Sequence, residues 1–264
     1  MGIRLVISDM DGTLFGKDER LPAFASEFSP ALAERGILFA VATGRSLPMA
    51  RRFVRLLSPT APCVYANGAL ICSESEVIEE LRLPLYPLKA LLDDAVDCGM
   101  SVVVNWDDRE DFVLKHTEWT LMQSETFGVY QTEHYPTPEE WRAKGAYKIL
   151  VKDRQHRIER LTGRLEHMTE ECSFVRYETG AAEIMPAGLN KARGILRLAG
   201  ALGIAKEDVL AIGDFYNDIE MMTSVGWSAA VGNAIDEVKR NAGYICGGEG
   251  AWGVKEAIET LCLS

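Results

Sequence analysis

The N-terminal and C-terminal parts of the sequence show the same pattern, in which short apolar runs alternate with segments of helical spacing. Residues 3–8 form an apolar run with β-branched residues that ends at a turn, which is typical of a strand buried on both faces. Helical spacing follows at 22–35, ended by Gly36, and again at 46–57. Further strands are expected at 37–42 and 63–66. This alternation predicts a doubly wound parallel sheet with right-handed crossovers.

The alternation of apolar runs and helical segments resumes after Pro186. Strands are expected at 208–212, 227–231 and 243–246, and helices at 191–202, 217–224, 235–241 and 253–261. The chain therefore builds one Rossmann-like α/β core from two separate stretches, residues 1–83 and 187–264.

Between those stretches the pattern changes. Asn67-Gly68 is a strong turn signal, and a hairpin is expected over about 69–83. Residues 84–186 then read as an inserted α+β domain, although 116–145 shows no assignable pattern. The expected elements of this domain are helices at 88–98 and 157–170 and strands at 101–106, 111–115, 147–152 and 173–185.

Length and charge exclude several classes of protein. A chain of 264 residues can bury a sizeable core without needing disulfides or structural metals. The net charge of −11 disfavours non-specific binding to nucleic acid or to an anionic membrane. No apolar run approaches the ~18 residues of a membrane span, and the N-terminus lacks the layout of a signal peptide. The six cysteines form no CxxC pair and are interpreted as buried thiols. A cytoplasmic monomer is expected.

Two carboxylates follow the first expected strand, in Ser8-Asp9-Met10-Asp11-Gly12-Thr13. Ligands of α/β folds bind at this end of the strands. The alternative is an ordinary surface turn, since Asp and Gly favour turns. Because the two carboxylates directly follow a buried strand, we favour the interpretation that they belong to a ligand-binding site.

A second acidic group follows the expected strand at 208–212, in Gly213-Asp214-Phe215-Tyr216-Asn217-Asp218. Carboxylates that meet from two strand ends repel one another unless a cation lies between them. Hard oxygen ligands suit Mg²⁺. The alternative for Asn217 and Asp218 is a helix N-cap.

Two further segments could bind phosphate. Thr43-Gly44-Arg45 follows the second expected strand and offers a hydroxyl and backbone N–H groups at a helix entry. Lys191 opens the first helix after the insertion. A lone lysine is usually a solvated side chain, so it gains weight only together with the other motifs.

Together the four motifs resemble the haloacid-dehalogenase-like superfamily of phosphatases, and the position and size of the insertion resemble its Cof-type subfamily with a large α/β cap. The resemblance spans the whole α/β portion and includes Asn67-Gly68-Ala69 and Val231-Gly232-Asn233-Ala234. It implies a Mg²⁺-dependent phosphoric monoester hydrolase that acts through an aspartyl-phosphate on small phosphorylated metabolites, with sugar phosphates expected.

The resemblance also implies roles for single residues. Asp9 is the nucleophile, and Asp11 is the general acid and then the general base. Asp9, Asp214 and the backbone carbonyl of Asp11 would bind the metal. The phosphoryl oxygens would be held by Met10, Thr43, Gly44, Lys191 and Asn217. Supporting roles are open for Arg45, Asn67 and Asp218.

Two other functions stay open from sequence: phosphoryl transfer within one sugar, as in phosphomutases, and metabolite binding without turnover. The string Gly248-Glu249-Gly250-Ala251-Trp252-Gly253 matches a dinucleotide fingerprint, but too little chain follows for a second strand. Specificity is expected from the insertion, with four candidate residues: Trp106, Arg109, Lys148 and Glu183.

Overall fold

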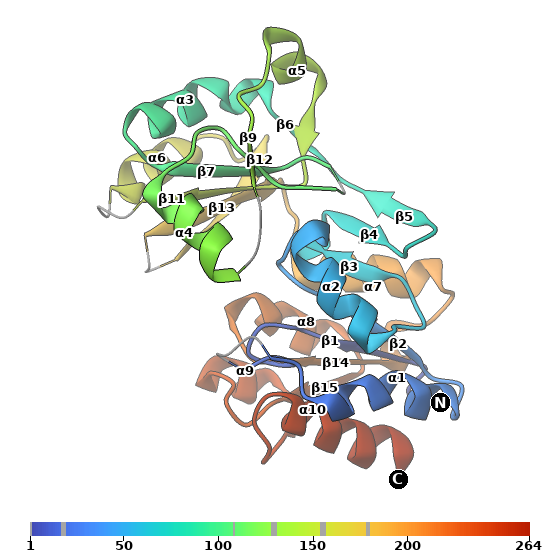
Figure 1. The fold of residues 1–264 in the computed structure, drawn as a ribbon. Coiled ribbons are helices and arrows are strands. Elements are labelled where there is room, and N and C mark those ends of the chain that lie inside the picture. Colours follow the sequence, from blue (N-terminus) through green and yellow to red (C-terminus); the bar gives the residue numbers. More distant parts are fainter. Residues whose placement is uncertain (1, 17–19, 108, 128–130, 154–156, 178–179) are drawn as a thin grey trace. The chain divides into compact units, whose positions relative to one another are not determined.

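The structure of the chain is a computed structural model, and it describes all residues except 1, 17–19, 108, 128–130, 154–156 and 178–179. The chain divides into two compact units. The first unit comprises Met1–Arg45, Ala50–Glu79 and Asn190–Ser264, and the second comprises Ser46–Met49 and Glu80–Leu189. Figure 1 shows the elements of both units along the chain.

A five-stranded parallel sheet organises the first unit, in the order β16-β15-β14-β1-β2. Its strands are β1 (Leu5–Ser8), β2 (Leu38–Val41), β14 (Val209–Gly213), β15 (Trp227–Ala230) and β16 (Tyr244–Ile245). The central strand β14 and its neighbour β1 are buried along their whole length, as their continuous apolar sequence predicts. The expected doubly wound α/β class is confirmed.

Helices complete the first unit. They are α1 (Phe28–Ala33), α2 (Leu47–Leu57), α7 (Lys191–Ala201), α8 (Ile219–Ser224), α9 (Asp236–Asn241) and α10 (Ala251–Ile258). Short turns of helix lie at Ala23–Glu27, Ala66–Gly68, Lys206–Asp208, Tyr216–Asp218 and Glu259–Leu263. The helix expected over 22–35 is split into a 3₁₀ turn and α1. Pro30 explains the break, because it has no N–H to donate to the preceding turn and fits only near a helix start.

The strand expected at 63–66 does not join the parallel sheet. It forms β3 (Cys63–Tyr65), which pairs antiparallel with β4 (Leu70–Cys72) in a separate sheet that also holds β5 (Val77–Glu80). A parallel bridge between Ala42 and Val64 links β3 to the segment after β2, where the Thr43 N–H also donates to the Val64 carbonyl at 2.9 Å. The physical reason is local: three successive residues with positive φ, at 66, 67 and 68, reverse the chain directly after β3. The predicted turn at Asn67-Gly68 is confirmed, but it joins β3 to β4.

The second unit is built on a six-stranded sheet in the order β12-β13-β11-β7-β8-β9. Its strands are β7 (Ser101–Asn105), β8 (Phe112–Val113), β9 (Thr132–Glu133), β11 (Lys148–Lys152), β12 (Cys172–Tyr177) and β13 (Ala181–Pro186). The single strand expected at 173–185 is thus a pair of strands. A two-stranded ribbon and its neighbouring turn lie at β6 (Leu83–Pro84), β10 (Gly145–Ala146) and Tyr86–Leu88. The helices are α3 (Lys89–Asp97), α4 (Glu118–Phe127), α5 (Pro138–Ala143) and α6 (Ile158–Leu165).

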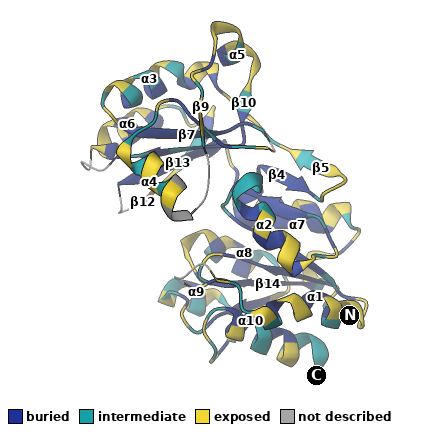
Figure 2. Cartoon of the chain, in the orientation of Figure 1, coloured by how far each residue is buried: buried dark blue, intermediate teal, exposed yellow. Residues whose placement is uncertain are grey.

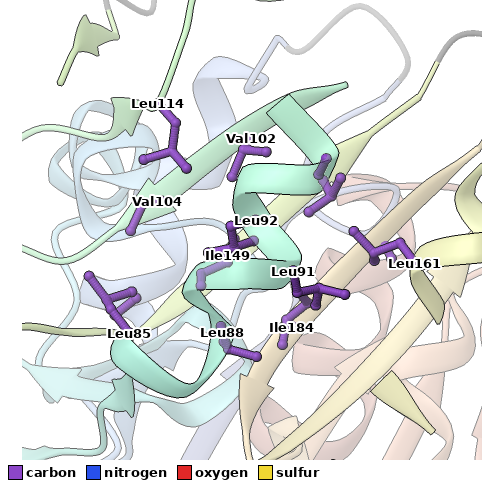
Figure 3. Close-up of a cluster of buried hydrophobic side chains, with 14 of the residues drawn as sticks. Leu85, Leu88, Leu91, Leu92, Val102, Val104, Leu114, Ile149, Leu161 and Ile184 are labelled. Atoms are coloured by element: carbon purple, nitrogen blue, oxygen red, sulfur yellow. The ribbon is translucent and has the colours of Figure 1, made fainter. Parts of the chain in front are cut away.

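One apolar cluster forms the core of the second unit (Figure 3). Helices α3 and α6 contribute leucines such as Leu92 and Leu161, and the sheet contributes alternate residues such as Val104, Ile149 and Ile184. Because side chains alternate along a strand, the residues next to these point to the opposite face of the sheet. The opposite face carries polar side chains, among them Asn105, Lys148 and Glu183.

Burial follows the strands and the inner faces of the helices (Figure 2). All six cysteines are free thiols, and Cys98 and Cys262 are only partly buried. Within the described part of the chain, no helix has the length and apolar character needed to cross a membrane.

Candidate active site

Carboxylates from two neighbouring strands meet at the C-terminal edge of the parallel sheet. Asp9 directly follows β1, and Asp214 directly follows β14. One oxygen each of Asp9, Asp214 and Asp218 lies within 4.8 Å of the others, and all three residues are buried. The convergence that the sequence predicted for Asp9 and Asp214 is therefore present in the structure.

Lys191 lies between two of these carboxylates. It is the first residue of α7, whose N-cap is Asn190, and its side chain is completely buried. Its Nζ atom donates to Asp9 Oδ1 and to Asp218 Oδ1, each at 2.6 Å. Lys191 is thus placed to bring positive charge to Asp9.

Asp218 is committed on both oxygens. Oδ1 accepts from Lys191, while Oδ2 accepts from the backbone N–H groups of Asp214 at 2.9 Å and Phe215 at 3.0 Å. Asp218 therefore fixes both the lysine and the loop that carries Asp214. Its position fits an orienting role better than direct binding of a cation.

Burial makes it energetically unfavourable for the carboxyl groups of the acidic cluster to ionise. It raises the pKa of Asp9 well above the ordinary range, although Lys191 works in the opposite direction. Burial also raises the pKa of Asp214 to about 6, against a hydrogen bond from Thr13. Burial alone would lower the pKa of Lys191, but the charges of Asp218 and Asp9 outweigh it and raise that pKa. Positive charge near Asp9 and Asp214 would favour their ionised forms.

The turn after Asp11 fits closely around Asp214. Thr13 Oγ1 donates to Asp214 Oδ1 at 2.7 Å. Gly12 has a φ of +85°, and a Cβ atom at this position would lie 2.2 Å from Asp214 Oδ2. Glycine is required here for both reasons, conformation and space.

Asp11 occupies a different environment from Asp9. Its side chain is 50% exposed, whereas that of Asp9 is 6% exposed. Arg45 grips the Asp11 carboxylate with two nitrogens: Nε lies 2.9 Å from Oδ2, and Nη2 lies 2.5 Å from Oδ1. The Arg45 guanidinium carbon also lies 5.2 Å from the centre of the Phe53 ring. This bidentate contact separates the Asp11 side chain from the buried acidic cluster.

The remaining predicted phosphate-binding residues follow three strands of the parallel sheet, since Met10 follows β1, Thr43 and Gly44 follow β2, and Asn217 follows β14. The Asn217 amide donates to Asn67 Oδ1 at 3.3 Å. A Cβ on Gly44 would lie 3.1 Å from the same oxygen, so Gly44 lies against Asn67. Thr43 is fully buried, and its hydroxyl accepts from the Arg45 N–H at 3.1 Å. Met10 is also fully buried, in the turn between Asp9 and Asp11.

Sequence reasoning assigned no role to Thr13 or Asn233. Asn233 donates to the Gly12 carbonyl at 2.8 Å and accepts from the Gly250 N–H at 2.7 Å, so it links the turn after Asp11 to a distant loop. Both residues lie inside motifs that the sequence already marks, and their contacts depend on tertiary structure. In the glycine-rich string, Gly248 N–H and Gly250 N–H both donate to side chains of the protein itself.

The sequence profile of the haloacid dehalogenase-like hydrolases matches residues 6–258. The chain is 30% identical to the 5-amino-6-(5-phospho-D-ribitylamino)uracil phosphatase YcsE of Bacillus subtilis, an alignment that covers 99% of this chain and 96% of that protein. It is 26% identical to the putative phosphatase YkrA of the same organism, over 100% and 99% of the two chains. Its fold matches the crystal structure of a haloacid dehalogenase-like hydrolase from Bacteroides thetaiotaomicron, with a TM-score of 0.87, 25% identity, and coverage of 98% and 99%.

The chain therefore belongs to the haloacid dehalogenase-like hydrolase family, as the profile match over nearly its whole length shows. Within that family its relatives are phosphatases, and the chain is a phosphoric monoester hydrolase. The resemblance seen in the four sequence motifs is confirmed.

Proposed function

We propose that this enzyme is a Mg²⁺-dependent phosphatase of small phosphorylated metabolites, sugar and polyol phosphates above all, and that it acts through an aspartyl-phosphate on Asp9. One observation carries the proposal. Two carboxylates of one short turn have opposite surroundings: Asp9 is buried against Lys191, and Asp11 is half-exposed against Arg45. Carboxylates that differ in this way can take different roles in one reaction.

The residues present fit a hard divalent cation. Asp9 and Asp214 offer buried carboxylate oxygens within 4.8 Å of one another, and the charge repulsion between them calls for a positive partner. Mg²⁺ bound there would neutralise charge on the phosphoryl group and on the carboxylates. The Asp11 backbone carbonyl is proposed as a further ligand.

The side chains of the site then divide the work. Asp9 attacks phosphorus through a carboxylate oxygen, while Lys191 reduces the repulsion between that oxygen and the phosphate. As the bond from phosphorus to the alcohol oxygen breaks, Asp11 gives its proton to that oxygen. Asp11 next takes a proton from water, whose oxygen attacks phosphorus and releases Asp9 and inorganic phosphate. Thr43, Gly44 and Asn217 are proposed to hold the phosphoryl oxygens.

One comparison supports the choice of substrates. The relative with 30% identity is named for a substrate that carries a phosphorylated ribityl chain. We also propose that the second unit is a cap that selects the substrate, and that the chain works as a cytoplasmic monomer without nucleic acid or membrane partners.

Rapid acid quench with labelled acetyl phosphate and Mg²⁺, followed by peptide mapping, tests the mechanism. Label is expected on Asp9, and Asp9→Asn should abolish it. Asp11→Asn should still form some phosphoenzyme from this reactive substrate, and its breakdown should be slow. The exposed Asp236 supplies a matched control, because Asp236→Asn should behave like the wild type. Label on any other residue, or equal labelling of the Asp9→Asn protein, would refute the assignment.

A further inference from the structure

Residues 231–235 follow β15 and form hydrogen bonds to both turns that carry the acidic cluster, and we call them the linking segment. The Ile235 N–H donates to the Asp214 carbonyl at 3.0 Å, which fixes the turn after β14. The Asn233 side chain donates to the Gly12 carbonyl at 2.8 Å, which fixes the turn after β1. One short segment therefore ties together the two turns whose carboxylates converge.

The turn after Asp11 needs such an anchor because of Gly12. Glycine is required there, since φ is +85° and a Cβ atom would lie 2.2 Å from Asp214 Oδ2. Glycine is also the residue with the greatest backbone freedom. The Gly12 N–H is fixed by the Phe15 carbonyl at 3.0 Å, and its own carbonyl is fixed by Asn233. Asn233 thus restrains the peptide group that the bond to Phe15 does not restrain.

Residues 247–250, which we call the glycine-rich loop, hold the linking segment in place. The Gly250 N–H donates to Asn233 Oδ1 at 2.7 Å, so the orientation of the Asn233 amide is set and its nitrogen is left to donate. The Gly232 N–H donates to the Gly248 carbonyl at 2.7 Å. The side chain and the backbone of the linking segment are therefore both bound to this loop.

The glycine-rich loop is itself fixed to helix α10 by Glu256. The Glu256 carboxylate accepts from the Gly247 N–H at 3.1 Å and from the Gly248 N–H at 2.9 Å. It also accepts from the Tyr244 hydroxyl at 2.8 Å, which holds it in position. A continuous set of hydrogen bonds therefore runs from α10 through the loop and the linking segment to the turn after β1.

The spacing of the two turns matters for a metal site. Oxygens of Asp9 and Asp214 lie within 4.8 Å of one another. Mg²⁺ accepts only a narrow range of ligand positions. A turn that moved among several positions would bind the ion in only a fraction of its conformations, and the apparent affinity would fall by that fraction.

We propose that Asn233, held by the glycine-rich loop, is a positioning residue that fixes the spacing of the two turns and so raises the affinity of the site for Mg²⁺. This inference rests on the Mg²⁺ site of the proposed function and adds the residues that preorganise it. It also gives a function to the glycine-rich loop, whose Gly248 and Gly250 N–H groups bind side chains of the protein rather than a phosphate.

A titration of Mg²⁺ against phosphate release tests the role of Asn233. Asn233→Ala removes the hydrogen bonds to Gly12 and Gly250, and because Asn233 is exposed the variant should still fold. The Mg²⁺ concentration for half-maximal activity should rise at least ~5-fold, as expected for a lost hydrogen bond, while kcat at saturating Mg²⁺ stays within about twofold. A purely structural role would instead lower the active fraction, and so kcat, without moving this midpoint.

Asn241→Ala is the matched control. Asn241 is also exposed, and its side chain donates to the Glu237 carbonyl of its own helix at 2.7 Å. The variant loses a comparable hydrogen bond outside the linking segment. Its Mg²⁺ midpoint should therefore equal that of the wild type.

Gly250→Ala tests the glycine-rich loop by a separate route. Gly250 has a φ of +55°, so alanine would strain the loop and displace the N–H that binds Asn233. The Mg²⁺ midpoint should rise at least ~2-fold. Gly203→Ala is its control, because Gly203 has a φ of +65° and a Cβ there would meet nothing within 4 Å, and its midpoint should not move. Should Asn233→Ala fail to fold by circular dichroism, Gly250→Ala decides the test.

Hydrogen exchange in the metal-free protein separates this inference from the proposed function. The Gly12, Leu14 and Phe15 N–H groups form hydrogen bonds within the turn, so a peptide that covers residues 9–15 reports on its order. Exchange should be at least ~5-fold faster in Asn233→Ala and unchanged in Asn241→Ala. If exchange accelerates as expected but the wild type releases no phosphate with Mg²⁺, the proposed function alone is refuted. Unchanged exchange, or an unchanged Mg²⁺ midpoint in an active Asn233→Ala enzyme, would overturn the positioning role.

Discussion

Replacing Asp111 with Asn removes a carboxyl group that the fold buries, and the effect on stability should depend on pH. Burial raises the pKa of Asp111 from an ordinary 3.8 to about 6, although Ser46, Lys148 and Asn105 lower it and Asp107 adds to the rise. The folded chain therefore holds this proton at a pH where the unfolded chain has lost it. The stability that Asp111 contributes is fully present below pH ~4 and is lost as the pH rises through about 6.

The magnitude follows from the difference between the two pKa values. Each tenfold change in acid dissociation corresponds to about 1.4 kcal/mol, so ionising Asp111 in the folded chain costs about 3 kcal/mol more than in the unfolded chain. Asn has the same size and never ionises. The stability of Asp111→Asn relative to the wild type should therefore rise by about 3 kcal/mol between pH 4 and pH 7.5.

Thermal unfolding at a series of pH values measures this difference. For a chain of this size, 3 kcal/mol corresponds to a relative rise in Tm of roughly 6–12 °C. Asp97→Asn on α3 is the control, because Asp97 is exposed and loses little hydration on folding, and its difference from the wild type should stay flat. A relative stability of Asp111→Asn that is independent of pH, or that falls toward pH 7.5, would contradict the reasoning.

Three further perturbations test the candidate active site. Lys191→Met leaves Asp9 and Asp218 as buried carboxylates without their cation. The free energy of unfolding, measured in urea near pH 7, should fall by about 3–5 kcal/mol. A loss below about 1 kcal/mol would argue against the buried network. Arg45→Gln removes the contacts that position the Asp11 carboxyl group. Alkyl phosphates need the proton from Asp11 more than acetyl phosphate does, so the variant should slow their hydrolysis at least ~10-fold more in phosphate-release assays. Equal slowing of both substrates would point to phosphate binding by Arg45 instead. Chelation by EDTA should abolish phosphate release and added Mg²⁺ should restore it, whereas full activity without metal would count against a metal site.

Sequence reasoning located the acidic cluster because its signal is local. Asp9 and Asp214 each follow a short buried strand, and parallel strands bring their carboxyl ends to one edge. The hydrogen bonds of Thr13 and Asn233 join residues about 200 positions apart, and no local pattern encodes them. The same holds for Asp111, which the sequence placed only in an expected strand.

The segment 116–145 could not be predicted for a different reason. Its elements are short: β9 and β10 have two residues each. Among the described side chains of helix α4, Leu121 and Met122 are 50% and 44% exposed, so they do not form a buried apolar stripe. Strand β3 was assigned to the wrong sheet because its apolar run is equally typical of either one.

The ribosome synthesises the strands of the five-stranded sheet at two separate times, first β1 and β2 and later β14, β15 and β16. Strand β1 pairs on one side with β2 and on the other with β14, whose residues emerge about 200 positions later. At usual rates of translation that delay is roughly 10–40 seconds. During it, residues 80–189 are complete and contain all partners of their own six-stranded sheet. The second unit is therefore expected to fold first, and a ribosome that pauses after residue 189 would prolong the exposure of β1 to chaperones or to aggregation.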